Sequence, residues 1–571
     1  MLSTKLKWSL INKHAKNRVS STCDDFSSND FNDFFVSYVK DVRNGINKSP
    51  IVDPHLLVGD YMTSATMSTW SLITEMHVLE IIMKMKPSKS KDIFDMSNDI
   101  IKYVALEILT PLTYCINKCL NDGVFPSRLK TARVIPLFKG GDKSLMKNYR
   151  PISLVPVLGK IIETIAKNQL TAYFDAHNLF SSDQYGFRKG ISTMDAIETI
   201  VTNVYTAMEN GELAQITACD LTKAFDCVDH RILLRKLAQY GVSGNALNFF
   251  KSYLENRFQI VDLDGVRSDP VVLESGVPQG SILGPLMFLV MINDLPNNVK
   301  SAKAVLFADD TNFLTRHKDL TMLNCMTSNA FKEASAWFES NCFSLNDAKT
   351  QKIICTSGNR LLYDQSTQSI KFLGIHIDKN LNWNAHIDFV ATKLSSVLYL
   401  LKSLVSEVPS HYVRSAYFSY FQSVVSYGLV IWGNASKIND ILLLQKKAIR
   451  ILTGSSYTAH CRPLFVATKI LTVINLYIYH ILNYVKVELH NFNVTSTNYS
   501  TRQQNQLEIP FCRLTRTQNS HRVMGLKLFN KLDISVRDMS KSVFSDKLYS
   551  WLLLNPFYKI DEFLEYSCIY I

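Results

Sequence analysis

The chain reads Ile216-Thr217-Ala218-Cys219-Asp220-Leu221 at one point and Ala304-Val305-Leu306-Phe307-Ala308-Asp309-Asp310 at another. Each stretch is an apolar run of strand length that ends in carboxylates. A carboxylate at the end of a buried strand is held rigidly, and its oxygens are the hard ligands that Mg²⁺ prefers. Two Mg²⁺ ions about 4 Å apart can activate an attacking hydroxyl and stabilise a leaving oxygen. The alternative is that these aspartates simply occupy surface hairpin turns, where Asp is common.

The pattern around these stretches alternates between strands and helices. Apolar spacing and turn residues predict helices over 71–86, 99–121, 158–174, 229–256 and 281–294 and one starting near Ser192, with strands over 131–138, 215–220, 352–356 and 370–377, and hairpins over 257–274 and 303–314. Residues 1–70 are polar, with a Ser/Asp/Asn-rich patch at 24–33, and predict an irregular linker or extension. The whole pattern indicates an α+β protein.

Composition bounds the class of protein. The 571 residues are 47% hydrophobic and 20% charged, so most of the chain should fold, in about three to four structural units. The net charge is +12, which favours an acidic partner such as nucleic acid. Residues 381–571 hold 20 Lys and Arg against 11 Asp and Glu, so this part carries most of the excess.

Cysteines and apolar runs argue against secretion and membrane spans. The 11 cysteines are scattered and form no Cys-x-x-Cys pair, which suits a reducing compartment and argues against a zinc knuckle. Cys115 and Cys119 are interpreted as small buried side chains. The basic N-terminus lacks the apolar core of a secretory signal. Residues 415–436 are uncharged but contain five serines, so they predict a buried helix rather than a bilayer span.

An ordered series of motifs extends the two acidic stretches. The series reads Arg133-Val134-Ile135-Pro136-Leu137-Phe138-Lys139, Asn148-Tyr149-Arg150-Pro151-Ile152-Ser153-Leu154, Gln184-Tyr185-Gly186-Phe187-Arg188, Asp220-Leu221-Thr222-Lys223-Ala224-Phe225-Asp226, Gly276-Val277-Pro278-Gln279-Gly280-Ser281, Ile292-Asn293-Asp294-Leu295-Pro296, Phe307-Ala308-Asp309-Asp310, Leu345-Asn346-Asp347-Ala348-Lys349-Thr350 and Phe372-Leu373-Gly374-Ile375. In this order the motifs resemble the reverse transcriptases of non-LTR (LINE-type) retrotransposons, close to the jockey group. The resemblance spans roughly residues 75–470.

The resemblance implies a fold and a division of the chain. It implies a right-hand polymerase with fingers, an antiparallel-sheet palm and a helical thumb, followed by a helical C-terminal extension. The expected divisions are an N-terminal extension (1–70), fingers and palm (71–384), a thumb (385–470) and a basic C-terminal region (471–571).

The resemblance also implies roles for single residues. Asp220, Asp309 and Asp310 match the metal-binding carboxylates, and the backbone carbonyl of Leu221 is placed to face a metal. Phe225 resembles the residue that excludes a ribose 2′-hydroxyl; the alternative is a core aromatic of the following helix, and both can be true. Gln279 and Gly280 are expected near the nucleotide, where free N–H groups at the start of the 281–294 helix could face a triphosphate.

Basic residues complete the expected site. Lys139 and Arg150 match the pair that binds the triphosphate, the Arg through a bidentate fork, with ordinary basic surface as the alternative. Lys349 matches a lysine that could donate a proton to pyrophosphate. Leu373 and Gly374 resemble the turn that grips the primer end. In the thumb, basic and aromatic groups are expected along a template–primer backbone, with a solvated basic face as the alternative: Trp432, Gln445, Lys446, Lys447 and Arg450.

The chain also departs from the family pattern. No stretch resembles the endonuclease domain that usually precedes the polymerase, and 89–93 lacks the glycine often seen ahead of the fingers. These departures suggest a fragment or a decayed copy of an element.

The expected activity is RNA-directed DNA polymerisation inside the cell, in the nucleus or cytoplasm. It would need two Mg²⁺ ions, or Mn²⁺ as a substitute, with a template RNA, a DNA primer and dNTPs as partners and no membrane. Two alternatives stay open: a catalytically silent or domesticated nucleic-acid-binding remnant, and a two-metal nuclease, which gives no role to Phe225 or Gln279.

Overall fold

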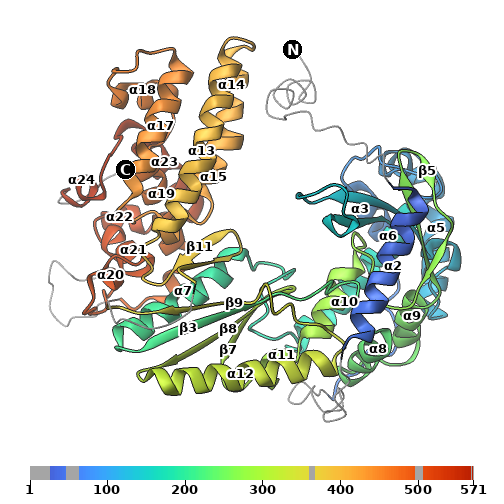
Figure 1. The fold of residues 1–571 in the computed structure, drawn as a ribbon. Coiled ribbons are helices and arrows are strands. Elements are labelled where there is room, and N and C mark those ends of the chain that lie inside the picture. The colour runs from blue at the N-terminus through green and yellow to red at the C-terminus, as the bar shows by residue number, and fades with distance from the viewer. Residues whose placement is uncertain (1–25, 47–63, 359–366, 495–505, 567–568, 570–571) are drawn as a thin grey trace. The chain divides into compact units, whose positions relative to one another are not determined.

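The computed structural model describes residues 26–46, 64–358, 367–494, 506–566 and 569 (Figure 1). It contains both helices and antiparallel and parallel strand pairs, so the predicted α+β class is confirmed. By its internal contacts the chain divides into two compact units. The first unit comprises the described residues within 21–199 and 215–352, and the second comprises those within 200–214 and 353–571.

The first unit holds most of the predicted motifs. Its elements are α2 (Ser28–Asn44), α3 (Glu75–Lys84), α4 (Asn98–Tyr103), α5 (Ala105–Asn121), η3 (Ser127–Lys130), β1 (Thr131–Phe138), η4 (Met146–Asn148), β2 (Tyr149–Leu154), α6 (Val157–Ala176), α7 (Thr193–Glu209), β3 (Leu213–Cys219), α8 (His230–Gln239), α9 (Gly244–Leu254), β4 (Arg257–Leu263), β5 (Val266–Arg267), β6 (Val271–Leu273), α10 (Leu283–Ile292), α11 (Leu295–Asn298), β7 (Lys303–Phe307), β8 (Asp310–His317), α12 (Leu320–Ser340) and β9 (Gln351–Cys355). Three of them, α7, β3 and β9, also contribute residues to the second unit.

One sheet of the first unit is built around β1. Its strand order is β2-β1-β4-β5, with β6 paired to β4. β1 is antiparallel to β2 and parallel to β4, and it has the bounds that its apolar run predicted. The expectation of an irregular segment over 1–70 is wrong for 28–44, because α2 is a helix packed against β4. Ser27 and Asp30 form its capping box, so polar residues that suggested a loop are in fact a helix start.

A second sheet carries the two acidic stretches. Its order is β7-β8-β3-β9, and β7 and β8 form the predicted hairpin, closed by the pair Phe307 and Asp310. α12 packs against β8 (Figure 1). α10 packs against α6 and α8, and all its residues except Pro285 are buried. A helix that is apolar on every side is stable only when it is enclosed in this way.

A fully enclosed ion pair lies beneath α10. Lys236 Nζ lies 2.6 Å from Asp294 Oδ1 and donates to the Met291 carbonyl at 2.8 Å, and neither side chain has accessible surface. The ammonium also sits 4.6 Å from the Trp337 ring centre. The adjacent Asn293 is equally buried and donates to the Leu179 carbonyl. The Asn-Asp pair of the 292–296 motif is therefore a core polar network.

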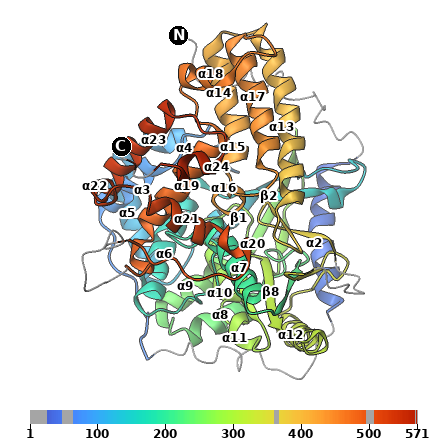
Figure 2. The same ribbon diagram turned by 90° about the vertical axis from the view of Figure 1, so that its left-hand side faces the viewer.

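The second unit is mainly helical. Its further elements are β10 (Ser369–Phe372), β11 (Ile375–Asp378), α13 (Asn384–Val405), α14 (Ser410–Ala416), the π-helical turn η5 (Tyr417–Gln422), α15 (Ser423–Ser426), α16 (Leu429–Trp432), α17 (Ile438–Thr453), α18 (Cys461–Thr468), α19 (Val473–Val487), η6 (Leu489–Asn491), α20 (Thr515–Gln518), α21 (His521–Phe529), α22 (Ile534–Arg537), α23 (Lys541–Leu554) and α24 (Ile560–Leu564). α13 and α17 lie side by side (Figure 2).

The core of the second unit centres on α19. This helix packs against α16, α17, α21 and α23. Its start is fixed by Gln445, whose Oε1 accepts from the Val473 N–H at 2.7 Å. Asn475 donates to the carbonyls of Leu552 and Asn555 at 2.6 and 2.8 Å, which ties the C-terminal helices to α19. Residues beyond 471 are thus part of this core.

The uncharged stretch 415–436 differs from its prediction. It was expected to form one buried helix, but it consists of the end of α14, the turn η5, and the short helices α15 and α16. Gly428, at a φ of 67°, separates the last two. Within the described residues no single helix has the length and apolar character needed to cross a membrane; α18 and α19 pass such a test only as a pair bent by 52°.

The cysteines are unpaired in the described part of the chain. The interpretation of Cys115 and Cys119 as buried side chains is wrong, since Cys115 is exposed and Cys119 is partly exposed on α5. Cys219, Cys227 and Cys355 are buried, and burial raises the pKa of each thiol to about 12. These three thiols are therefore protonated and act as small apolar groups. Cys23 and Cys568 lie outside the described residues.

Candidate active site

Three predicted carboxylates meet at neighbouring strands of the β7-β8-β3-β9 sheet. Asp220 directly follows β3, while Asp309 lies in the turn between β7 and β8 and Asp310 is the first residue of β8. Burial raises the pKa of Asp310 to about 6, and the charges of Asp309 and Asp220 add to the shift. Burial also raises the pKa of Asp309; the charge of Asp220 adds to this, and that of Arg150 opposes it. The turn therefore concentrates negative charge that the protein only partly compensates.

The Gln184-Tyr185-Gly186 segment holds this acidic turn in place. Gln184 is fully buried, and its Oε1 accepts from the N–H groups of Ala308 at 3.0 Å and Gly186 at 2.8 Å. Tyr185 N donates to the Leu306 carbonyl at 2.8 Å. A Cβ on Gly186 would collide with the Ala308 nitrogen, so only glycine fits. Sequence reasoning used this motif only for the resemblance and missed its supporting role.

The predicted basic residues act on the acidic stretches, Lys349 and Lys139 on Asp220 and Arg150 on Asp309. Lys349 Nζ lies 3.1 Å from Asp220 Oδ2, and both side chains remain partly exposed. Lys139 and Arg150 directly follow Phe138 and Tyr149, which face each other across β1 and β2. Burial lowers the pKa of Lys139, as do the charges of Lys223, Arg150 and Lys349, while Asp220 raises it. A cluster of cations that repel one another is suited to a multiply charged anion.

Gln279 is held by a partner that the sequence interpretation did not assign. Gln279 Nε2 donates to both carboxylate oxygens of Asp226, at 2.8 and 2.9 Å. The Gln279 carbonyl accepts from Ser153 N at 2.8 Å, which joins this loop to β2. Gly280 has a φ of 125°, and a Cβ there would collide with the Ser153 carbonyl. Gln279 and Gly280 are thus placed rigidly between β2 and the loop after β3.

The expectation of free N–H groups at the start of the 281–294 helix is wrong. Glu163 Oε2 accepts from Ile282 N at 2.6 Å and from Leu283 N at 3.4 Å, and Ser281 Oγ accepts from Gly284 N at 2.9 Å. Glu163 is buried, and burial raises its pKa. The start of α10 is therefore already capped by a carboxylate from α6 and cannot serve a triphosphate.

Phe225 and Leu221 lie on the turns that follow β3. Phe225 is half-buried in a turn rather than in a helix, and its ring stacks on Phe288 at 4.5 Å. It is thus both packed and close to the carboxylates in sequence, as either interpretation requires. Leu221 is buried and forms a β-bridge with Leu345, and the Asp220 carbonyl accepts from Asn346 N at 2.8 Å. The 345–350 motif therefore fixes the backbone of the first acidic stretch.

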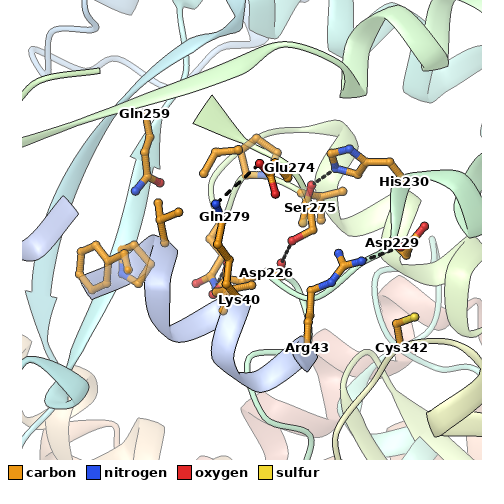
Figure 3. Close-up of a pocket in the computed structure, with 18 of the residues that line it drawn as sticks. Lys40, Arg43, Asp226, Asp229, His230, Gln259, Glu274, Ser275, Gln279 and Cys342 are labelled. Atoms are coloured by element: carbon orange, nitrogen blue, oxygen red, sulfur yellow. Dashed lines mark hydrogen bonds and ion pairs between the residues drawn. The ribbon is translucent and has the colours of Figure 1, made fainter. Parts of the chain in front are cut away.

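A cavity of about 790 Å³ lies in the first unit beside Gln279 (Figure 3). Its walls are the inner face of α2 and the segment 273–279. Arg43 reaches from α2 to Asp229 at 2.6 Å, and His230 Nε2 lies 2.7 Å from the Gly276 carbonyl. These contacts fix α2 against the loops that carry Gln279 and Asp226.

The remaining predicted residues belong to the second unit. Leu373 and Gly374 form the turn between β10 and β11, and Tyr427 donates its hydroxyl proton to the Leu373 carbonyl at 2.5 Å. This contact holds the turn, and sequence reasoning did not find it.

The basic helix face is less available than expected. Lys446 Nζ lies 3.7 Å from the Tyr558 ring centre, and Arg450 donates through Nε and Nη2 to the Ala459 carbonyl. Lys447 is exposed. Trp432 and Gln445 were expected beside nucleic acid, but both are buried in the core. Of these five residues, Lys447 is the most accessible to a ligand.

The donor set of the acidic turns fits a hard divalent cation. Within the described ranges, no group of three or more His, Cys, Asp or Glu side chains is already arranged to hold a metal ion. The carboxylates of Asp220, Asp309 and Asp310 nevertheless supply the oxygen donors that Mg²⁺ prefers, and water and phosphate usually complete its shell. Burial and then the charges of neighbouring aspartates raise the pKa values of Asp309 and Asp310, and a bound cation would offset both effects.

Comparison with known proteins gives one consistent result. Residues 139–377 match the sequence family described as reverse transcriptase (RNA-dependent DNA polymerase). The chain is 29% identical over 425 residues to the RNA-directed DNA polymerase from mobile element jockey of Drosophila melanogaster, covering 69% of this chain and 45% of that protein. It is 29% identical over 416 residues to the probable RNA-directed DNA polymerase from transposon BS of the same species, covering 66% and 44%.

A third relative is the probable RNA-directed DNA polymerase from transposon X-element of Drosophila melanogaster, 26% identical over 415 residues, covering 69% of this chain and 46% of that protein. The chain thus spans less than half the length of these curated relatives. The matched region includes both acidic turns, Lys139, Arg150, Gln279 and Lys349. Residues 139–377 thus match the reverse transcriptase family, and the chain is similar to the RNA-directed DNA polymerases of jockey and related mobile elements.

Proposed function

We propose that the chain is an RNA-directed DNA polymerase that copies the RNA of a non-LTR retrotransposon. The observation that carries the proposal is the meeting of Asp220, Asp309 and Asp310 at neighbouring strand ends, beside the cations Lys139, Arg150 and Lys349. Carboxylates that gather divalent cations, next to cations that gather phosphates, are the groups that phosphoryl transfer needs.

The proposal assigns polymerase subdomains to the two units. The two sheets of the first unit would form the fingers and palm, and α13 to α18 of the second unit would form the thumb. Two Mg²⁺ ions, held by the three carboxylates and the Leu221 carbonyl, would activate the primer hydroxyl and neutralise charge on the phosphates. The template would be RNA, the primer DNA and the substrates dNTPs.

The protein's own groups would position the nucleotide. Lys139 and Arg150 would bind the triphosphate at the ends of β1 and β2, with the Arg suited to two phosphate oxygens. Lys349, now 3.1 Å from Asp220, would turn to the departing pyrophosphate. Gln279, fixed by Asp226, would contact the nucleotide, and Phe225, stacked on Phe288, would exclude a 2′-hydroxyl.

The contacts of the primer and template would fall to the second unit. Leu373 and Gly374, in a turn held by Tyr427, would support the primer end. Lys447 would meet the template–primer backbone, with smaller contributions from Lys446 and Arg450, whose side chains are already engaged within the protein. Positioning of this kind can supply a large part of the acceleration of a two-substrate reaction.

A primer-extension assay tests the proposal. The purified chain should extend an oligo(dT) primer on poly(A) RNA in the presence of Mg²⁺ and dTTP. Asp309→Asn should lower the rate by at least about 10³-fold, because an amide binds a divalent cation weakly, while RNA affinity should stay within about threefold.

Asp264→Asn is the matched control, since Asp264 also lies in a hairpin turn but is far from the acidic site in sequence. It should extend primers like the wild type. Undiminished extension by Asp309→Asn would overturn the catalytic assignment. RNA binding by a wild type that extends no primer would favour a nucleic-acid-binding remnant.

A further inference from the structure

The helix α2 presents a row of aromatic rings to the first unit. Phe31, Phe34, Phe35 and Tyr38 follow helical spacing, so they share one face. Neighbouring rings contact each other: Phe31 and Phe35 have centres 5.7 Å apart, and Phe34 and Tyr38 stack at 5.5 Å. Aromatic contacts of this kind fix side chains in place more firmly than area alone.

This aromatic face packs on the strand ends that carry two cations of the site. Phe31 meets the Tyr149 ring edge to face at 4.9 Å, and Tyr149 meets Phe138 at 5.3 Å. Phe31, Phe35 and Tyr149 belong to one buried cluster with Val134 and Val261. Lys139 and Arg150 are the residues that directly follow Phe138 and Tyr149. The helix therefore stabilises the backbone from which both cations project.

The same face holds a third cation, Lys223. Lys223 Nζ lies 5.8 Å from the Phe35 ring centre and 5.9 Å from that of Tyr38, within the range of cation–π attraction. Its backbone has a φ of 51°, a conformation that costs energy for a side-chain-bearing residue and is often found at functional sites. Its carbonyl accepts from the N–H groups of Asp226 and Cys227 at 2.9 and 3.0 Å, which fixes the turn.

We propose that Lys223 is a further triphosphate-binding residue, and that the Phe35 and Tyr38 rings of α2 hold its ammonium group beside Lys139. Lys223 lies between Asp220 and Phe225, on the turn that the proposed function places under the nucleotide. Burial is the largest cause that lowers the pKa of Lys139, and the charge of Lys223 is the second largest. A ligand with several negative charges would relieve the repulsion among Lys139, Lys223, Arg150 and Lys349, whereas a single neighbouring carboxylate would not. The inference rests on the proposed polymerase function and extends it to the N-terminal helix.

Nucleotide affinity can be measured without catalysis. A fluorescent dUTP would be titrated by anisotropy into the full chain bound to primer–template, with Ca²⁺ replacing Mg²⁺. Lys223→Met should raise the Kd about tenfold or more, the loss expected for one charge-assisted hydrogen bond. The affinity for inorganic tripolyphosphate, measured by competition, should fall by the same factor, because the contact is to phosphate rather than to the base. Lys223→Arg keeps the charge and should stay within about threefold of the wild type.

The role of α2 is tested by variants of Tyr38. Tyr38→Leu should raise the Kd about threefold, and Tyr38→Phe, which keeps the ring, should leave it unchanged. Tyr38→Leu added to Lys223→Met should cause no further loss, because both changes act through one ammonium group. Lys40→Met is the control: its ammonium lies on the same helix but pairs with the exposed Glu274 at 3.6 Å. It should bind like the wild type.

The outcomes separate this inference from the proposed function. An unchanged Kd in Lys223→Met, in a protein whose wild type extends primers, would overturn the inference and leave the polymerase assignment intact. Weaker binding in Lys223→Met, in a protein whose wild type extends no primer, would support the site and count against the polymerase. A further loss in the double variant would show that α2 acts through other contacts and would overturn its positioning role. Melting curves of all variants exclude unfolding as the cause.

Discussion

The two units differ in how far their basic side chains are already engaged in contacts within the protein. In the first unit, Lys349 pairs with the partly exposed Asp220, and the charges of Lys223, Arg150 and Lys349 act on Lys139. In the second unit, which carries most of the basic excess, Lys446 covers the Tyr558 ring and Arg450 binds a backbone carbonyl. A count of charges therefore predicts a basic surface, but it does not predict which charges are left for a ligand.

The largest expected effect in the first unit comes from removing the side chain that supports the acidic turn. Gln184→Ala removes the acceptor of two buried N–H groups, which should cost about 2–4 kcal/mol of unfolding free energy. Displacement of the Asp309–Asp310 turn by about 1 Å should lower the extension rate roughly 10²-fold. RNA affinity should not change, because it depends on other residues.

Gln184→Met separates the hydrogen bonds from the volume of this side chain. It keeps the length but has no amide oxygen, so it should behave like Gln184→Ala in both chemical denaturation and extension. Wild-type activity in Gln184→Met would mean that the turn needs only a filled space, and the proposed supporting role would be wrong.

Sugar selection is the next largest expected effect. Phe225→Ala should reduce the ratio of kcat/KM for dTTP over UTP by about 5- to 160-fold, since steric exclusion in a rigid pocket is worth roughly 1–3 kcal/mol. Phe338→Leu, a buried aromatic change on α12, should lower Tm and leave the ratio unaltered. If the ratio in Phe225→Ala equals that of the wild type, Phe225 is only a packing residue.

When no cation is bound, the negative charges of the acidic turn should lower the free energy of unfolding. The pKa of Asp310 rises from its ordinary value to about 6, so ionisation destabilises the fold above pH 6, and the penalty fades between pH 6 and 4. Asp310→Asn should therefore raise the unfolding free energy at pH 7.5 by about 1 kcal/mol, after allowance for solvent screening, or Tm by about 2–4 °C. The gain should disappear near pH 4. Equal Tm values at pH 7.5 would show that the charges are already compensated.

The smallest effects should distinguish basic residues within the second unit. Lys447→Gln should reduce the slope of log Kd against log salt for template–primer binding by about one, as expected for one lost phosphate contact. Lys446→Gln and Arg450→Gln should change the slope less, because their side chains are held by Tyr558 and Ala459. Equal slopes for all three variants would contradict this ranking. Deletion of 471–571 cannot serve instead, since it removes the core helix α19.

Elements with a strong local pattern were predictable from the sequence. The strand 131–138 and the hairpin around Asp309 are apolar runs closed by turn residues, and both are confirmed. Helix α2 was missed although its aromatic spacing was visible, because its capping residues Ser27 and Asp30 belong to a polar patch that is typical of loops. The segment 415–436 was predicted as one helix because its composition hides the break at Gly428.

The sequence predicted the charged residues of the candidate site, but not the contacts that hold them in place. The order of the acidic stretches, together with Lys139, Arg150 and Lys349, was enough to expect their meeting. The supports come from far along the chain: Glu163 caps α10, and Gln184 holds Ala308. Such contacts depend on tertiary packing, and neither hydrophobic periodicity nor residue spacing carries that information.

The buried side chains of Lys236 and Asp294 depend on each other for stability. Replacing one of them leaves a bare charge in a fully enclosed space, at a cost of about 3–5 kcal/mol, which is much of the stability of an ordinary domain. Replacing both by apolar residues can be nearly neutral. Selection for a folded protein should therefore change Lys236 and Asp294 together, whereas a sequence that drifts without selection should lose one of them first. Comparing these two positions across related sequences would separate those kept under selection from those in decay.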